Sequence, residues 1–158
     1  MKKTIDIQLA VETALPVSEK ILRQWAKLAL GEAYQAHELT LRFVEKEEIR
    51  TLNRTYRQQD KPTNVLAFPS SLPDEIKKIH PFLGDVIICP EVLQEESHHD
   101  EIPLIEHWAH IVIHGILHLQ GYDHIETEDA QIMQALEIQL LAKLGFSNPY
   151  HTEDDDIE

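Results

Sequence analysis

The sequence has little of several features that would place a protein in a special class. It contains a single cysteine, Cys89, so no disulfide can form within the chain and a reducing compartment, the cytoplasm, is expected. No apolar run approaches the roughly 18 residues of a membrane-spanning helix, and we expect no membrane contact. The opening residues, MKKTIDIQLA, lack an apolar core and a small-residue cleavage site, so we expect no signal peptide.

Basic residues are also scarce, and they are unevenly distributed. The 158 residues include 14 Lys and Arg against 28 Asp and Glu, a formal net charge of −14. Residues 79–158 hold only one of the basic residues but 17 of the acidic ones. This balance argues against nonspecific binding to a polyanion, so contact with nucleic acid requires a local basic patch. We expect one domain over residues 1–150 and an acidic, disordered tail over 151–158.

What the sequence does contain is a series of strand and helix patterns. Alternation of polar and apolar residues predicts strands, whereas spacings of three and four, with end signals, predict helices. The predicted strands are 4–10, 38–44, 64–68 and 84–89, and the predicted helices are 17–31, 45–57, 91–97, 103–120 and 126–144. Prolines and polar residues indicate a loop over 69–83. Because strands and helices do not alternate strictly, the sequence predicts a single α+β domain with a mixed sheet.

The helix predicted over 103–120 is apolar around most of its circumference, which is typical of a helix buried in the middle of a domain. His114 and His118 are four residues apart and therefore project from one face, and Gly121 permits a turn that brings in His124. Three imidazoles can hold one zinc ion per chain and leave a fourth position open to water. Nickel and copper also accept imidazole and are alternatives to zinc.

Residues 114–124 can be aligned with the metzincin protease pattern H-E-x-x-H-x-x-G-x-x-H, but Gly115 stands in place of the glutamate. In zinc proteases that glutamate is the general base, so the metal ligands are predicted without the base of peptide hydrolysis. His107 and His110 lie on roughly the same face and are interpreted as packing residues or hydrogen-bond partners of the ligands. The alternative is that the whole row of histidines is structural.

Five basic residues mark the helix predicted over 45–57 and the residues just after it: Lys46, Arg50, Arg54, Arg57 and Lys61. The first four share one face, which suits recognition of RNA phosphates. The alternative is a solvated face paired with Glu45, Glu47 and Glu48. A separate apolar stripe, expected to face the core, is formed by Ile49, Leu52 and Tyr56. Asp85, which follows Gly84 at the start of the strand over 84–89, is either a strand-start residue or a polar group that reaches a cleft.

Three segments together support a family resemblance. They are LNRTYRQQDKPTNVLAFP (52–69), LGDVIIC (83–89) and HWAHIVIHGILHLQGYDH (107–124), and the motif HGxLHLxGYDH is specific. With them the chain resembles the YbeY family of bacterial zinc endoribonucleases. The resemblance implies an α+β fold in which a mixed four-stranded sheet packs against about five helices, with the buried central helix carrying the metal ligands. It also implies the zinc ligands His114, His118 and His124 and a functionally important Arg57. One departure is Ala67, where the family usually has serine before Phe-Pro.

The resemblance further implies a cytoplasmic, single-strand-specific endoribonuclease that matures the 3′ end of 16S ribosomal RNA and serves ribosome quality control, with a ribosomal partner. Arg57 would stabilise the charge of the transition state, and the other basic residues would hold the flanking RNA. The general base is left open between Asp85, a zinc-bound hydroxide and the RNA's 2′-hydroxyl. Two alternatives are a metzincin-like zinc peptidase and a non-catalytic ribosome-assembly factor whose zinc is structural.

Overall fold

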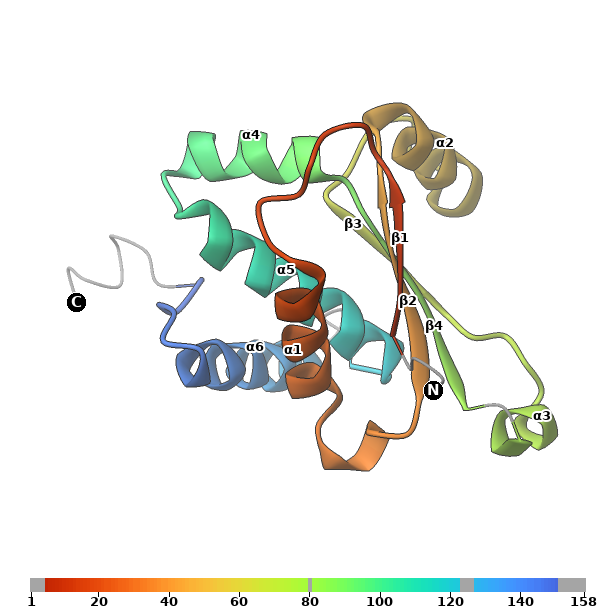
Figure 1. Cartoon of the computed structure of the whole chain (residues 1–158). Helices are drawn as coiled ribbons and strands as arrows, with labels where there is room; N and C mark the ends of the chain where they lie inside the picture. Colours follow the sequence, from red (N-terminus) through yellow and green to blue (C-terminus); the bar gives the residue numbers. More distant parts are fainter. Residues whose placement is uncertain (1–4, 80, 123–126, 151–158) are drawn as a thin grey trace.

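A computed structural model of the chain describes residues 5–79, 81–122 and 127–150. In this part of the chain a four-stranded sheet is combined with six α-helices and one 3-10 turn, Glu32–Tyr34 (Figure 1). The strands are β1 (Ile5–Ala10), β2 (Glu38–Val44), β3 (Val65–Pro69) and β4 (Phe82–Ile88). The helices are α1 (Glu19–Leu30), α2 (Lys46–Arg57), α3 (Asp74–Ile79), α4 (Pro90–Asp100), α5 (Leu104–Leu119) and α6 (Thr127–Lys143).

The sheet is mixed, in the order β1-β2-β4-β3. Strands β1, β2 and β4 run parallel, and β3 pairs with β4 in the antiparallel direction and forms one edge. Because successive side chains point to opposite faces, Val86 and Ile88 of β4 join the larger core cluster, whereas Ile87 joins a smaller cluster beneath α2. The predicted α+β class with a mixed four-stranded sheet is confirmed.

Helix α5 is the centre of the domain. It contacts β3 and β4 on one side and α1, α4 and α6 on the others, as Figure 1 shows. Trp108 is 1% exposed and stacks on Phe43 of β2, with ring centroids 5.5 Å apart. Most of the apolar surface of α5 is therefore buried against neighbouring elements, as the sequence predicted, although Ile105 near its start is 38% exposed.

Helix α2 lies on the face of the sheet opposite to α5, where Ile49 is fully buried in the smaller cluster. Leu52 is partly buried there, but Tyr56 is 57% exposed. The expectation that Tyr56 faces the core is therefore wrong. Its ring instead meets the edge of the sheet at Phe68, with the ring centroids 5.3 Å apart.

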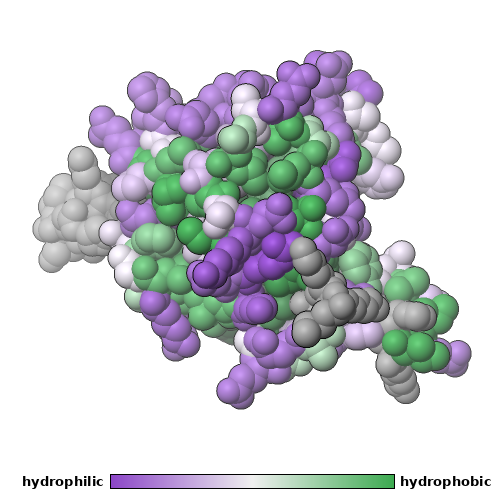
Figure 2. Space-filling view, viewed as in Figure 1, coloured by the Kyte–Doolittle hydropathy of each residue, from purple (hydrophilic) through white to green (hydrophobic). Residues whose placement is uncertain are grey.

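The stretch 69–83, predicted as a loop, differs from that prediction in two places. Residues 74–79 form the short helix α3 directly after Pro73, and β4 begins at Phe82, two residues before its predicted start. A helix of six residues has too few turns to show helical periodicity in a sequence. Apolar side chains stay exposed on α3, where Ile79 is 74% exposed, and they form the hydrophobic group at the lower right of Figure 2. Among the described helices, none has the length and apolar character needed to cross a membrane.

Candidate metal centre and active site

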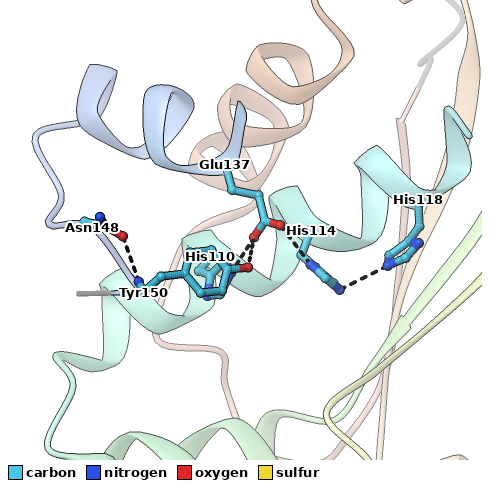
Figure 3. Close-up of polar contacts among 6 residues, drawn as sticks. All are labelled: His110, His114, His118, Glu137, Asn148 and Tyr150. Carbon is cyan, nitrogen blue, oxygen red and sulfur yellow. Dashed lines mark hydrogen bonds and ion pairs between the residues drawn. The ribbon is translucent and has the colours of Figure 1, made fainter. Parts of the chain in front are cut away.

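Two of the three predicted metal ligands face each other on α5. The Nε2 atoms of His114 and His118 are 3.2 Å apart (Figure 3). Two imidazole nitrogens bound to one tetrahedral zinc ion at their usual distances are about 3.3 Å apart. The two nitrogens therefore have the spacing that a shared metal ion requires. This spacing arises because one turn of helix separates the two residues.

Glu137 of α6 fixes the orientation of His114 from the other side of the ring. Its side chain is buried, and its Oε1 atom lies 3.2 Å from Nδ1 of His114. When Nδ1 donates its proton to this carboxylate, the lone pair of His114 is on Nε2, which faces His118. A carboxylate behind a ligating histidine is the usual device that sets the tautomer and the ring orientation.

The same carboxylate is the centre of a buried polar network (Figure 3). It forms a short hydrogen bond with Nε2 of His110, and the Tyr150 hydroxyl donates to it at 2.9 Å. Burial raises the pKa of Glu137, but hydrogen bonds and charge from His110 and His114 outweigh burial and lower the pKa to about 2. Burial, followed by the charge of Glu137, raises the pKa of Tyr150, so the phenol keeps its proton.

A second grouping of potential ligands involves the same residues. His110, His114 and Glu137 each offer an atom within 4.8 Å of the others and could hold a metal ion. His114 belongs to both groupings, through its two different ring nitrogens. The described residues therefore contain a candidate metal site on α5 and α6, and its Glu137 is not among the residues predicted from the sequence. The one indication of Glu137 in the sequence is an acidic residue between two apolar ones, Leu136 and Ile138, and in the structure its side chain is fully buried.

The third predicted ligand, His124, lies outside the described residues, as does the acidic tail 151–158. His107, which was interpreted as a packing or hydrogen-bonding residue, is turned away from the candidate metal site. Its Nε2 atom lies 2.9 Å from Oε1 of Glu96 on α4, and the Asn64 amide donates to the same carboxylate at 3.2 Å.

Arg57 lies at the same pocket as the two histidines. This cavity of about 340 Å³ is lined by Arg57, Asn64 and residues 65–67 of β3, together with His114, Gly115 and His118 of α5. The guanidinium donates from Nη2 to the carbonyl of Ala67 at 3.0 Å and lies 5.1 Å above the Phe68 ring. These contacts place a permanent positive charge at the edge of β3, beside the histidine pair.

Gly115 occupies the position at which zinc proteases carry their glutamate. A Cβ atom at this residue would lie 2.6 Å from Cγ1 of Val86 and 3.3 Å from Cγ2 of Val65. Helix α5 therefore approaches the sheet as closely as a glycine allows. The geometry leaves no room for a protease-like base at this position.

Asp85 lies in a different cavity from the histidines. It is paired across the sheet with Phe68 and is two residues from Ile87 in β4, so its side chain shares the α2 face with that of Ile87, whereas α5 covers the other face. The structure therefore does not bring Asp85 together with His114, and its catalytic role stays a prediction.

The basic residues of α2 are largely paired with acidic side chains, but not with the expected ones. Lys46 contacts Glu95 at 2.6 Å and Glu91 at 3.4 Å, both on α4. Arg50 and Arg54 approach Asp60 at 2.9 and 3.9 Å. The hydrogen bond from Arg50 lowers the pKa of Asp60. Lys61 lies with Lys46 and Arg50 along one shallow surface cavity, so three of the basic residues do share a surface.

The chain is similar to known proteins both in sequence and in structure. A family model described as Endoribonuclease YbeY matches residues 3–145. Proteins named Endoribonuclease YbeY from Legionella pneumophila, strains Corby and Philadelphia 1, are each 54% identical over 154 residues, which cover 98% of this chain and 98% of each relative. The solution structure of TM1509 from Thermotoga maritima is similar, with a TM-score of 0.58, 25% identity, and coverage of 94% of this chain and 99% of that one.

Proposed function

We propose, because this chain belongs to the YbeY endoribonuclease family, that it is a zinc-dependent endoribonuclease specific for single-stranded RNA. Membership of that family makes it a nuclease, a hydrolase that acts on phosphodiester bonds. The observation that supports the finer proposal is the shared pocket, in which Arg57 lies beside His114 and His118. A permanent cation next to a pair of metal-ligand nitrogens suits a phosphodiester, whose charge increases in the transition state.

His114, His118 and His124 are the proposed holders of one zinc ion. Zinc at this place would supply a Lewis acid for a phosphoryl oxygen and would lower the pKa of a bound water. Glu137 holds the His114 ring in the required tautomer. Arg57, whose Nη2 is fixed on the Ala67 carbonyl, directs its remaining N–H donors to phosphate oxygens and stabilises their developing charge.

We propose that no side chain of this pocket accepts the proton that the attacking group loses. Among the described residues that line it, none is a carboxylate, because Gly115 occupies the protease position and Asp85 lies across the sheet. This distribution leaves solvent to accept the proton, whether the attacking group is a water molecule or the RNA's own 2′-hydroxyl. It also disfavours the peptidase alternative, which would need a carboxylate here.

The proposed substrate is the 3′-end region of 16S ribosomal RNA, with a further part in ribosome quality control in the cytoplasm. The motif HGxLHLxGYDH, which is specific to the family that the sequence resembles, supports this assignment. A net charge of −14 disfavours tight binding to free RNA. We therefore propose that a ribosomal protein or the ribosome itself supplies part of the affinity, while Lys46, Arg50, Arg54 and Lys61 hold the RNA that flanks the cleaved bond.

The test compares wild type, Arg57→Ala and His114→Ala on an end-labelled single-stranded fragment of 16S ribosomal RNA, with the zinc content of each preparation measured. Arg57→Ala should keep its zinc and lose at least roughly 100-fold in cleavage rate, since it removes a group that stabilises transition-state charge. His114→Ala should lose both zinc and cleavage.

Three outcomes would contradict the proposal in different ways. Equal cleavage by all three proteins would show a contaminating nuclease. A chain whose Arg57→Ala variant processes ribosomal RNA normally in cells would be a non-catalytic assembly factor with structural zinc. Cleavage of casein by the wild type, without cleavage of RNA, would instead support the peptidase alternative.

A further inference from the structure

A second cavity, of about 590 Å³, lies on the α2 face of the sheet. Its walls are aromatic on several sides: Tyr56 from α2, Phe68 from β3 and Phe82 from β4. Of the two carboxylates that line the cavity, Glu48 and Asp85, Asp85 is the direct cross-strand partner of Phe68. Pro69, the last residue of β3, and residues 70–72 after it line the remaining side.

Two groups in this cavity are not used by the fold itself. Tyr56 is 57% exposed, although its ring contacts Phe68 in an edge-to-face arrangement with an interplanar angle of 66°, so much of its surface is open to solvent. Asp85 is partly buried and makes no hydrogen bond or ion pair with other residues that the structure describes. By contrast, Arg42 at the same cavity is held by Glu48 through two hydrogen bonds of 2.9 and 3.2 Å.

The aromatic cavity and the histidine pocket are separated by one strand. Ala67 lines the histidine pocket and Phe68 lines the aromatic cavity, because neighbouring residues of β3 face opposite sides. Arg57 spans the exposed edge between them, since it lines the histidine pocket and lies over the Phe68 ring at 5.1 Å. A nucleotide whose phosphate contacts Arg57 can therefore extend its base around this edge.

We propose that the aromatic cavity binds an unpaired nucleobase of the RNA, which stacks on Tyr56 and presents its N–H donors to Asp85. Aromatic side chains that stack single bases are the usual means by which proteins bind single-stranded nucleic acid. A base within a duplex cannot enter a cavity on the protein, so this contact selects single strands. Guanine is the preferred base, because its two adjacent N–H donors match the two oxygens of one carboxylate.

This inference rests on the proposed function and is tested by binding rather than by cleavage. The probes are heptamers with phosphorothioate linkages, which slow hydrolysis; their flanking sugars carry no base, and the central sugar carries guanine, adenine, cytosine or no base. The affinity of zinc-loaded, full-length protein for each heptamer is measured by fluorescence anisotropy. The proteins are wild type, Tyr56→Ala, Tyr56→Phe and Asp85→Asn.

Tyr56→Ala should weaken binding of the guanine heptamer about 5- to 150-fold, the range for loss of one stacked base, while Tyr56→Phe stays within about twofold. The abasic heptamer should bind wild type and Tyr56→Ala equally, because the partner of the ring is gone. Asp85→Asn should reduce the preference for guanine over adenine about tenfold, since an amide offers only one acceptor oxygen to the two donors.

Equal binding of the guanine heptamer by wild type and Tyr56→Ala would overturn the proposal, and so would an abasic heptamer that distinguishes the two proteins. Failure of the wild type to bind any heptamer would also overturn it. These outcomes are separate from those for the proposed function. A wild type that cleaves ribosomal RNA while Tyr56 has no effect on binding would leave the nuclease assignment intact and remove only the base site.

Discussion

At the scale of single residues, Gly115 has two opposing effects. In an exposed helix, alanine is preferred over glycine by about 1 kcal/mol. Here the added methyl group would meet Val86 at 2.6 Å. We expect Gly115→Ala to lower the free energy of unfolding by about 1–3 kcal/mol, the usual cost of overpacking a core. Urea denaturation of the two proteins measures this difference.

Val86→Ala supplies the control for that experiment, because it removes the atoms that the new methyl group would meet. The double variant Gly115→Ala/Val86→Ala should lose less stability than the two single changes added together. If the two stability losses were strictly additive, or if Gly115→Ala were more stable than wild type, α5 would not be in close packing contact with the sheet at this residue.

Glu137 gives a second prediction at this scale. Its carboxylate accepts from His110, His114 and Tyr150 within a buried network. We expect Glu137→Gln to weaken zinc binding about 10- to 100-fold, as is typical when the partner behind a ligating histidine is changed. Competition with a chromophoric chelator measures the affinity.

The matched control is Glu96→Gln, because Glu96 also pairs with a histidine of α5, His107, but away from the candidate site. That variant should bind zinc as wild type does. Equal losses in the two variants would mean that Glu137 acts only through the general stability of the domain.

The residues of the candidate site could be predicted to the extent that they lie close together in the sequence. The four-residue spacing of His114 and His118 determines their facing nitrogens. Glu137 could not be found in this way, because only the packing of α6 on α5 brings it behind His114. The side of the sheet on which Asp85 lies could not be predicted either, since it depends on the register of β4.

At the scale of elements, α2 has a face whose charges are partly neutralised. Asp60 contacts both Arg50 and Arg54. Asp60→Asn should release both guanidinium groups, and we expect affinity for single-stranded RNA to rise about two- to fivefold at low salt. The slope of log affinity against log salt should become steeper by up to about 0.7 for each additional phosphate that the released groups neutralise.

Glu19→Gln is the control for this change, because Glu19 pairs with Arg23 on α1 at 3.3 Å, at an exposed helix surface like that of α2. It should leave RNA affinity nearly unaltered. A similar rise in affinity from both variants would point to net charge alone rather than to the α2 surface.

The elements themselves were predicted well wherever their patterns were long. β2 begins and ends where expected, and α5 and α6 differ by one residue at each end. Helix α3 was missed because it is short and lies between prolines. The strand order β1-β2-β4-β3 had no signal in the sequence, because it is decided by which faces the helices cover after the chain collapses.

At the scale of the whole molecule, the excess of acidic residues opposes every contact with RNA. Five of them lie in the last six residues of the chain. Removal of residues 153–158 should therefore raise RNA affinity a few-fold at about 0.01 M salt, where the Debye length is about 30 Å, and have no effect near 1 M. A rise in affinity that persists at high salt would indicate steric blocking by the tail instead.

Strand β3 separates the two cavities, and Gly84 of β4 permits its close approach to β4. A Cβ atom at Gly84 would lie 2.2 Å from the carbonyl oxygen of Phe68, so this close pairing with Pro69 depends on the glycine. A slip of one residue in β3 would exchange Ala67 and Phe68 between the sides of the sheet. The bulky ring would then obstruct the histidines, and Tyr56 would lose its neighbour. Insertions within this strand are therefore expected to abolish cleavage and base selection together, whereas length changes within α3, beyond the residues that line the aromatic cavity, should be tolerated.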